Sequence, residues 1–274
     1  MINLKNSLVI LSSLTLLSGC FEGRINTKKL CEENPALRCE QLNMNDGQCR
    51  HPRTNLIWHR HVTQQEPTIA NKIQEFHFVD EYQKCLELAA QIEPTKPGNK
   101  KENRFNALMS TYKEQERLLE EIGHSDSPSA LYFMWTKGDN RAKVKFLSLE
   151  GSGKLQTAEL QYALATYYIT RDKEKTVVLL ENALTLTKAD QLNSAVIESL
   201  ASVNQSLGHK RHAYIWVMVA RELELPIASD RHLAVLYPFS EKEAERLQEI
   251  ATNITDALKD GQYKKNMLPA YAEK

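Results

Sequence analysis

Four cysteines in the first third of the chain are the residues whose type and spacing most clearly suggest chemistry. Seven, nine and 35 residues separate successive members of the set Cys31, Cys39, Cys49 and Cys85. A structural zinc site usually pairs ligands two to four residues apart, and a thioredoxin-like site needs a Cys-x-x-Cys pair. Because neither pattern is present, the spacing favours two disulfide bonds, with three possible pairings.

A metal site is the alternative for this region, because four histidines lie near the cysteines. These are His51, His59, His61 and His77. The cysteine spacing argues against zinc. Asp46-Gly47 is typical of a turn rather than of a calcium loop, which needs oxygen ligands at alternate positions. We therefore expect no metal and no cofactor.

Glu198 is the only residue that suggests catalysis. The pair Glu198-Ser199 is similar to the Glu-Ser of lytic transglycosylases, in which a single carboxylate acts as general acid. The other motifs of that family are missing, and so are GxSxG, HExxH and a phosphate-binding glycine loop. We expect a surface glutamate in a protein that is not an enzyme, with a glycan-cleaving hydrolase of the cell wall as the alternative.

The first 20 residues predict a cellular location. Lys5 precedes an apolar run at residues 8–17, which is too short to span a bilayer, and the segment ends in Leu-Ser-Gly-Cys. This ending resembles the bacterial lipobox, so residues 1–19 are expected to be a signal peptide and Cys20 to carry acyl chains such as palmitate. A plain signal peptide or a membrane-anchoring helix is the alternative.

Phe21, in place of an aspartate, is similar to the default that directs enterobacterial lipoproteins to the outer membrane. We therefore expect a lipoprotein of the cell envelope that is held in the outer membrane by its lipid anchor and faces the periplasm. The oxidising periplasm also agrees with disulfide bonds. From residue 20 onward the chain carries 34 basic and 35 acidic side chains, and this balance gives no reason to expect nucleic acid as a partner.

The remaining chain divides into four segments by pattern. Residues 20–65 contain the lipidated cysteine and show little helical periodicity, which predicts an irregular cap that includes three of the four cysteines. Residues 66–125 carry apolar residues at spacings of three and four on either side of a break with two prolines, which predicts a helical pair. Residues 126–260 contain repeats, and residues 261–274 are expected to form a loose tail.

The repeats share five positions with identical internal offsets in three copies. The sets are Ala130, Phe133, Ala142, Phe146, Leu149; Leu164, Tyr167, Thr176, Leu180, Ala183; and Ala201, Asn204, Ala213, Val217, Ala220. Copies that begin 34 and 37 residues apart, each with two helices and a polar turn, resemble tetratricopeptide or Sel1-like repeats. The expected fold is all-α: a tetratricopeptide-like helical repeat solenoid with an irregular disulfide-stapled N-terminal cap. A plain helical bundle is the alternative.

The chain as a whole resembles a bacterial family of predicted lipoproteins catalogued as domain of unknown function 2989. The stretches that carry the likeness are "NPALRCEQLNMNDGQCRHPRTNLIWHRH" at 34–61, "EYQKCLELAAQIEPTK" at 81–96, "ALYFMW" at 130–135 and "LQYALATYY" at 160–168. The resemblance implies a lipoprotein with tetratricopeptide-like helices. It implies no activity.

Resemblance to tetratricopeptide repeats implies a concave groove lined by the first helix of each pair. The matching positions are Leu131, Met134, Trp135, Gln161, Ala165, Tyr168, Glu198, Ser202 and Gln205. Such a groove would suit an extended protein or peptide segment with one apolar anchor, although Trp135 and Tyr168 could equally belong to the core. The expected function is a protein-binding adaptor or scaffold of the envelope. A purely structural lipoprotein whose cap makes the contacts is a further alternative.

Overall fold

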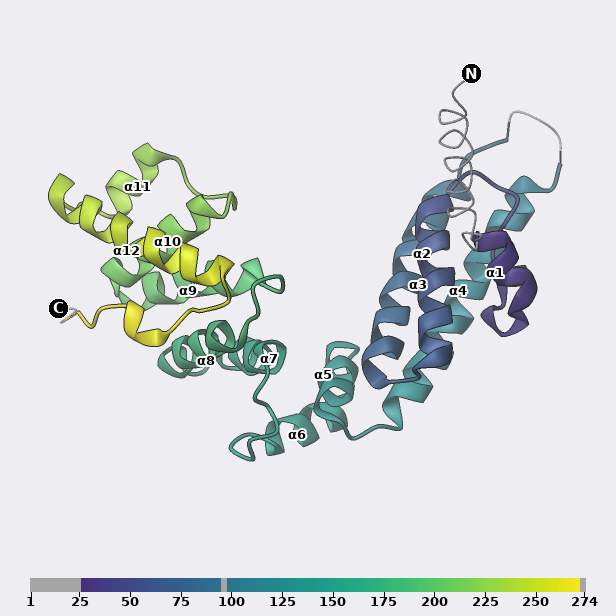
Figure 1. Ribbon diagram of the computed structural model, residues 1–274, viewed down its shortest axis with the longest axis horizontal. Coiled ribbons are helices and arrows are strands. Elements are labelled where there is room, and N and C mark those ends of the chain that lie inside the picture. The colour runs from purple at the N-terminus through teal and green to yellow at the C-terminus, as the bar shows by residue number, and fades with distance from the viewer. Residues whose placement is uncertain (1–25, 95–97, 272–274) are drawn as a thin grey trace, which may run out of the picture. The chain divides into compact units, whose positions relative to one another are not determined.

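The computed structural model describes residues 26–94 and 98–271 of the chain. The chain forms two compact units, Met1–His124 and Ser125–Lys274, called here the N-terminal and C-terminal units (Figure 1). All regular secondary structure in the described residues is helical, which confirms the all-α class. The expected signal peptide and the expected lipid attachment at Cys20 lie outside the described residues.

The N-terminal unit begins with two α-helices and two 3-10 turns where an irregular cap was expected. Helix α1 (Thr27–Glu33) is followed by the 3-10 turns η1 (Pro35–Leu37) and η2 (Cys39–Gln41), and then by the long helix α2 (Arg50–Gln65). The prediction of an irregular segment up to residue 65 was therefore wrong for α2. His51, His59 and His61 lie on this helix and not in a loop.

Helix α2 was missed because its buried face is partly made of charged residues. The positions that it buries are spaced by one, three or four residues, as in any amphipathic helix: Arg53, Leu56, Ile57, Arg60 and Thr63. A search for apolar periodicity reads the two arginines as solvent-facing and so breaks the pattern. Leu56 and Ile57 are fully buried, whereas Trp58 is 39% exposed.

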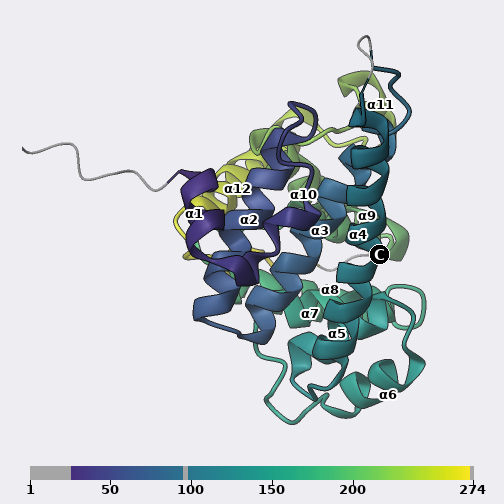
Figure 2. The same ribbon diagram turned by 90° about the vertical axis from the view of Figure 1, so that its right-hand side faces the viewer.

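Two long helices complete the N-terminal unit, with the proline-containing connection between them. Helix α3 (Ile69–Ala89) begins at Thr68, whose hydroxyl accepts a hydrogen bond from Asn71 N, and α4 (Lys100–Gly123) follows the proline-containing connection. Helices α2, α3 and α4 run side by side, with α1 against α2 (Figure 2). Their common core contains Phe76, Val79, Tyr82, Leu86, Leu118 and Ile122.

Both disulfide bonds lie in the N-terminal unit. Cys31 is bonded to Cys39 at a sequence separation of 8, and Cys49 to Cys85 at a separation of 36. The expectation of disulfide bonds is confirmed, and one of them joins Cys85 on α3 to the segment before α2. That bond ties the N-terminal segment to the helical pair, whereas the Cys31–Cys39 bond closes a local loop.

The two bonds should differ in their effect on stability because they close loops of different length. In the chain-entropy model, a loop of 36 residues contributes about 4 kcal/mol and one of 8 residues about 2.5 kcal/mol. We expect the double variant Cys49→Ala/Cys85→Ala to lose more free energy of unfolding than Cys31→Ala/Cys39→Ala. Urea unfolding followed by circular dichroism measures both. Equal losses, or a larger loss for the short loop, would contradict this interpretation.

The C-terminal unit contains eight α-helices within the described residues. They are α5 (Pro128–Thr136), α6 (Asn140–Ser148), α7 (Ala158–Tyr168), α8 (Lys173–Leu186), α9 (Ser194–Leu207), α10 (Lys210–Glu222), α11 (Asp230–Leu236) and α12 (Glu241–Lys259). Side chains cap most of the N-termini by accepting a backbone N–H, as Asp139, Thr157 and Asp172 do. Gly208, in the left-handed region at φ 82°, ends α9.

Consecutive helices of this unit pack as the pairs α5/α6, α7/α8 and α9/α10 (Figure 1). All fifteen positions aligned in the sequence are buried or half-buried. The polar members satisfy their own hydrogen bonds: Thr176 Oγ1 donates to Asp172 O and Asn204 Nδ2 donates to Leu200 O, both at 2.8 Å. Trp216 on α10 is the largest fully buried side chain.

Of the segment expected as a loose tail, the described residues 261–271 are packed instead. Tyr263 is 4% exposed, and Met267, Leu268 and Tyr271 pack against the core of the unit. A Cβ at Gly261 would lie 2.7 Å from Ala189 N, so the backbone there passes close to the segment after α8. Periodicity could not predict this packing because the segment is mostly non-helical, and irregular backbone buries side chains without a fixed period.

Candidate functional site

Three of the nine predicted groove positions are buried and not available to a partner. Leu131 is 5%, Gln161 3% and Ala165 1% exposed. Gln161 Nε2 donates to Leu155 O at 2.8 Å, and Asn182 Nδ2 donates to Gln161 Oε1 at 3.0 Å. The segment before α7, including the buried Leu155, thus covers the face of α7 that a regular repeat would leave open.

The aromatic positions of the predicted groove are half-buried within the C-terminal unit. Trp135 lies 5.7 Å from Phe146 and 5.9 Å from Tyr167 between ring centroids. Tyr168 donates its hydroxyl to Glu150 Oε2 at 2.6 Å. That hydrogen bond raises the pKa of Tyr168. Met134 is also half-buried and packs against the core, so these residues serve mainly to join neighbouring helices.

The last three predicted positions come together at a cavity of about 380 Å³. Glu198, Ser202 and Gln205 lie on α9, with Glu198 and Ser202 exposed. The other lining residues come from α9, α10, α11 and the connection before α11: Ala201, Val217, Ala220, Pro226, Ile227, Ala228, Leu233, Leu236 and Tyr237. We call this cavity the α9 pocket.

The α9 pocket has one polar side and a mainly apolar remainder. Tyr237 is 6% exposed and its ring lies 5.4 Å from that of Tyr214 and 6.3 Å from that of Phe239, which hold it in place. Burial raises the pKa of Tyr237, so its hydroxyl stays neutral. Glu198 is the only carboxylate among the lining residues, and none of them is a histidine or a cysteine. The pocket is suited to binding an apolar group beside a hydrogen-bond donor or a cation.

No metal site was found in the described residues, since no group of three His, Cys, Asp or Glu side chains could hold an ion there. The four cysteines near the histidines form two disulfide bonds and so offer no thiolate to a metal ion. His59 Nε2 lies 2.9 Å from Asn71 O, and His61 Nε2 lies 3.0 Å from Gln65 Nε2. These two histidines therefore contact the protein's own groups.

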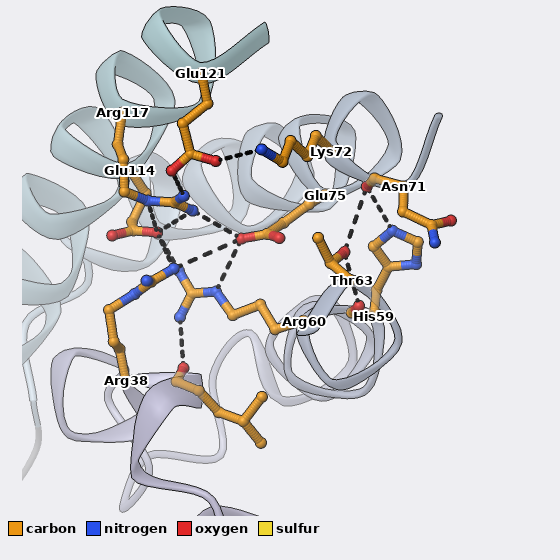
Figure 3. A network of polar contacts seen from close by, with 11 residues as sticks. Arg38, His59, Arg60, Thr63, Asn71, Lys72, Glu75, Glu114, Arg117 and Glu121 are labelled. Atoms are coloured by element: carbon orange, nitrogen blue, oxygen red, sulfur yellow. Dashed lines mark hydrogen bonds and ion pairs between the residues drawn. The ribbon is translucent and has the colours of Figure 1, made fainter. Parts of the chain in front are cut away.

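A buried network of ion pairs in the N-terminal unit was not predicted. Arg38 after η1, Arg60 on α2, Glu75 on α3, and Glu114 and Arg117 on α4 converge on one another (Figure 3). Glu114 Oε2 lies 2.7 Å from Arg38 Nη2, 3.0 Å from Arg60 Nη2 and 3.1 Å from Arg117 Nη2. The side chains of Arg60 and Glu75 are 3% and 4% exposed, whereas those of Arg38 and Arg117 are 30% and 31% exposed. The centre of the network is therefore buried and its edge reaches the surface.

The arrangement of this network indicates a structural role. Burial lowers the pKa of Arg60, an effect that Glu114 opposes, and the guanidinium stays charged because the pKa of arginine is far above neutrality. Arg60 Nη1 also donates to Leu37 O at 3.0 Å. Burial raises the pKa of Glu121 at the edge of the network, but hydrogen bonds from Lys72 and Arg117 outweigh this and lower it. Every carboxylate discussed here therefore has a cationic partner.

Asp46 forms a second buried ion pair, which holds the connection between η2 and α2. Arg104 Nε on α4 lies 2.5 Å from Asp46 Oδ2, and both side chains are 6% exposed. The hydrogen bond from Arg104 lowers the pKa of Asp46. Arg53 on α2 donates to Asn43 O and, at 2.9 Å, to Asp46 O. The connection is thus fixed from two helices, by Arg53 of α2 and by Arg104 of α4.

Removing one member of the first network should leave a buried charge without its partner. We expect Glu114→Ala to lower the free energy of unfolding by about 3–5 kcal/mol, because Arg60 stays buried. The matched control is Glu116→Ala, an exposed carboxylate on the same helix, which should change stability by less than about 0.5 kcal/mol. Chemical unfolding of both variants measures the difference, and similar losses would show that the network does not stabilise the unit.

The described residues define an all-helical protein with two disulfide bonds, a buried ion-pair network and an open, mainly apolar pocket. The chain belongs to the family described as "Protein of unknown function (DUF2989)", whose model matches residues 17–218. This match confirms the family resemblance of the sequence. No curated protein and no solved structure gave a significant match. None of the helices in the described part of the chain is long and apolar enough to cross a bilayer.

Proposed function

We propose that this protein is a lipid-anchored adaptor of the bacterial envelope, held in the outer membrane through Cys20 and facing the periplasm. In this proposal the C-terminal unit holds a protein or peptide partner. The sequence up to Cys20 supports the anchor and the location. The two disulfide bonds agree with an oxidising compartment.

We further propose that α5–α10 are divergent tetratricopeptide-like or Sel1-like repeats. The observations in favour are the three consecutive helix pairs and the fact that every aligned position is buried or half-buried. Small buried residues recur at corresponding positions of the second helices: Ala142 corresponds to Ala213, and Ala183 to Ala220. In this proposal the partner does not occupy the whole first-helix groove, because the face of α7 is covered.

The α9 pocket carries the binding proposal. It brings together three positions that the repeat pattern assigned to a groove, Glu198, Ser202 and Gln205, beside apolar side chains of α10 and α11. A cavity of about 380 Å³ is large enough for one apolar anchor residue of a partner. Glu198 at the exposed side favours a partner that carries a lysine, an arginine or free N–H groups next to the anchor.

A cell-wall hydrolase with Glu198 as general acid is the alternative that the sequence raised. Glu198 lies beside a mainly apolar cavity and not in a polar cleft, so we assign it to binding. A purely structural lipoprotein that makes its contacts through residues 20–65 is the other alternative. The structural alternative predicts that changes in the α9 pocket leave partner binding unaffected. The hydrolase predicts that the protein digests purified sacculi and that Glu198→Gln abolishes the digestion, so each alternative is separated from the adaptor.

Photocrosslinking in living cells tests the adaptor. A photoreactive phenylalanine analogue at Gln205 should yield one dominant adduct, and filling the pocket with Ala228→Trp should reduce that adduct about tenfold. Ala228 is exposed and lines the pocket, so the variant is expected to fold. The matched control is the same analogue at Asn253, an exposed residue of α12 in the same unit, which should give no such adduct. An adduct that persists in Ala228→Trp would overturn the pocket as the binding site.

The anchor has its own test. Cells fed with labelled palmitate should incorporate the label into the parent chain and not into Cys20→Ala, because Cys20 is the expected attachment site. The parent should fractionate with outer membranes and the variant should not. Labelling of Cys20→Ala at the parent level would contradict lipidation at this residue without touching the pocket proposal.

A further inference from the structure

A second cavity, of about 450 Å³, lies in the N-terminal unit between the η2 region and α4. Its lining residues are Cys39, Glu40, Gln41, Leu42, Asn43, Met44, Asn45, Asn103, Asn106, Ala107 and Ser110. We call it the amide pocket, because five of these side chains end in a carboxamide. It is separate from the α9 pocket, and the proposed adaptor role does not use it.

Most carboxamides of the amide pocket are not needed by the fold. Asn43 Nδ2 donates to Asp46 Oδ2 at 3.3 Å. For Gln41, Asn45, Asn103 and Asn106, no side-chain hydrogen bond to another described residue is present, and all four are exposed. Each carboxamide offers two donors and an acceptor. Together they match a ligand whose own groups both donate and accept, such as hydroxyl and amide groups.

Several backbone groups of the pocket wall are already used within the protein. Leu42 N donates to Cys39 O at 3.0 Å, and Asn43 N donates to Tyr82 Oη at 3.2 Å. Asn43 O accepts from Arg53, as described above. An extended peptide that adds as a strand needs a row of free backbone groups at an edge, and Leu42 N, Asn43 N and Asn43 O are occupied. The carboxamide side chains are therefore the main groups that the wall offers to a ligand.

The wall is also held in one position before any ligand binds. The Cys31–Cys39 bond fixes its start, and the Asp46–Arg104 ion pair fixes its end against α4. Binding to a prearranged wall avoids the cost of ordering it. The backbone positions from which the carboxamides extend are thus held in place at the cavity.

Charge and apolar area narrow the class of ligand. Glu40 is the only charged lining residue, so the pocket offers no cation for a phosphate, and a single carboxylate does not hold a metal ion. Met44 and Ala107 supply a small apolar area beside the amides. That area fits a methyl group and not a large aromatic anchor.

We propose that the amide pocket binds a neutral N-acetylated sugar of one or two rings. The carboxamides would pair with the hydroxyl and acetamido groups, and Met44 and Ala107 would contact the acetamido methyl group. The cavity volume lies within the range of small-ligand sites. Such sugars occur both as free oligosaccharides and as units of cell-wall glycan, and the chemistry of the pocket is the same for both.

Titration of the detergent-purified full chain with N,N′-diacetylchitobiose tests the proposal, with cellobiose as the probe that lacks acetamido groups. We expect N,N′-diacetylchitobiose to bind with a millimolar Kd. Calorimetry and saturation-transfer NMR should detect this binding at sugar concentrations up to about ten times the Kd. Cellobiose should bind at least about tenfold more weakly. Asn103→Ala/Asn106→Ala should weaken diacetylchitobiose about tenfold as well, whereas the exposed control Asn253→Ala should bind like the parent.

Ser110→Trp provides a second variant, because Ser110 lines the cavity and is only half-buried. It should abolish binding while circular dichroism stays that of the parent. Co-sedimentation with purified sacculi then distinguishes the sources: retention that diacetylchitobiose competes away indicates cell-wall glycan, and its absence indicates free sugar. No binding of diacetylchitobiose by the parent, or equal binding by all variants, would overturn the proposal and leave the adaptor role untouched.

Discussion

The buried ion pairs around Glu114 are the interaction on which the N-terminal unit depends. Arg38, Arg60 and Arg117 come from three separate segments and meet on one carboxylate that is itself largely buried. A buried charge pair contributes little net stability compared with apolar packing, but losing one member is costly. The network therefore acts mainly to specify which segments meet, and its geometry keeps η1, α2, α3 and α4 in register.

The cysteines and the Asp46–Arg104 pair extend this specification to the segment before α2. The Cys49–Cys85 bond connects that segment to α3, while Asp46 connects it to α4. Residues that looked capable of redox or metal chemistry are thus used to hold a non-helical wall in place. A wall held in this way can present amide side chains at fixed positions, which is the basis for the sugar-binding proposal.

The C-terminal unit relies on a different constraint, the close approach of helix pairs through small side chains. Ala142, Ala183 and Ala213 allow this approach, and the few polar residues inside bond to the backbone of their own helix. The pairs are not equivalent on the outside. Leu155 and Gln161 beside α7 are buried, whereas Glu198 and Ser202 on α9 are exposed at a cavity.

The sequence by itself determined the all-α class, the long helices α3 and α4, the use of the cysteines in disulfide bonds and the family. These follow from local periodicity, breakers and cysteine spacing, which act over short distances along the chain. Only the tertiary structure decided the pairing of the cysteines, the helical nature of α2 and the packing of the tail. It also decided which groove positions stay open, because the buried Arg60 and Gln161 have partners on other helices, Glu114 and Asn182, at sequence separations of 54 and 21. Such partners leave no periodic signal, and a charged side chain is interpreted as exposed until the carboxylate that pairs with it is located.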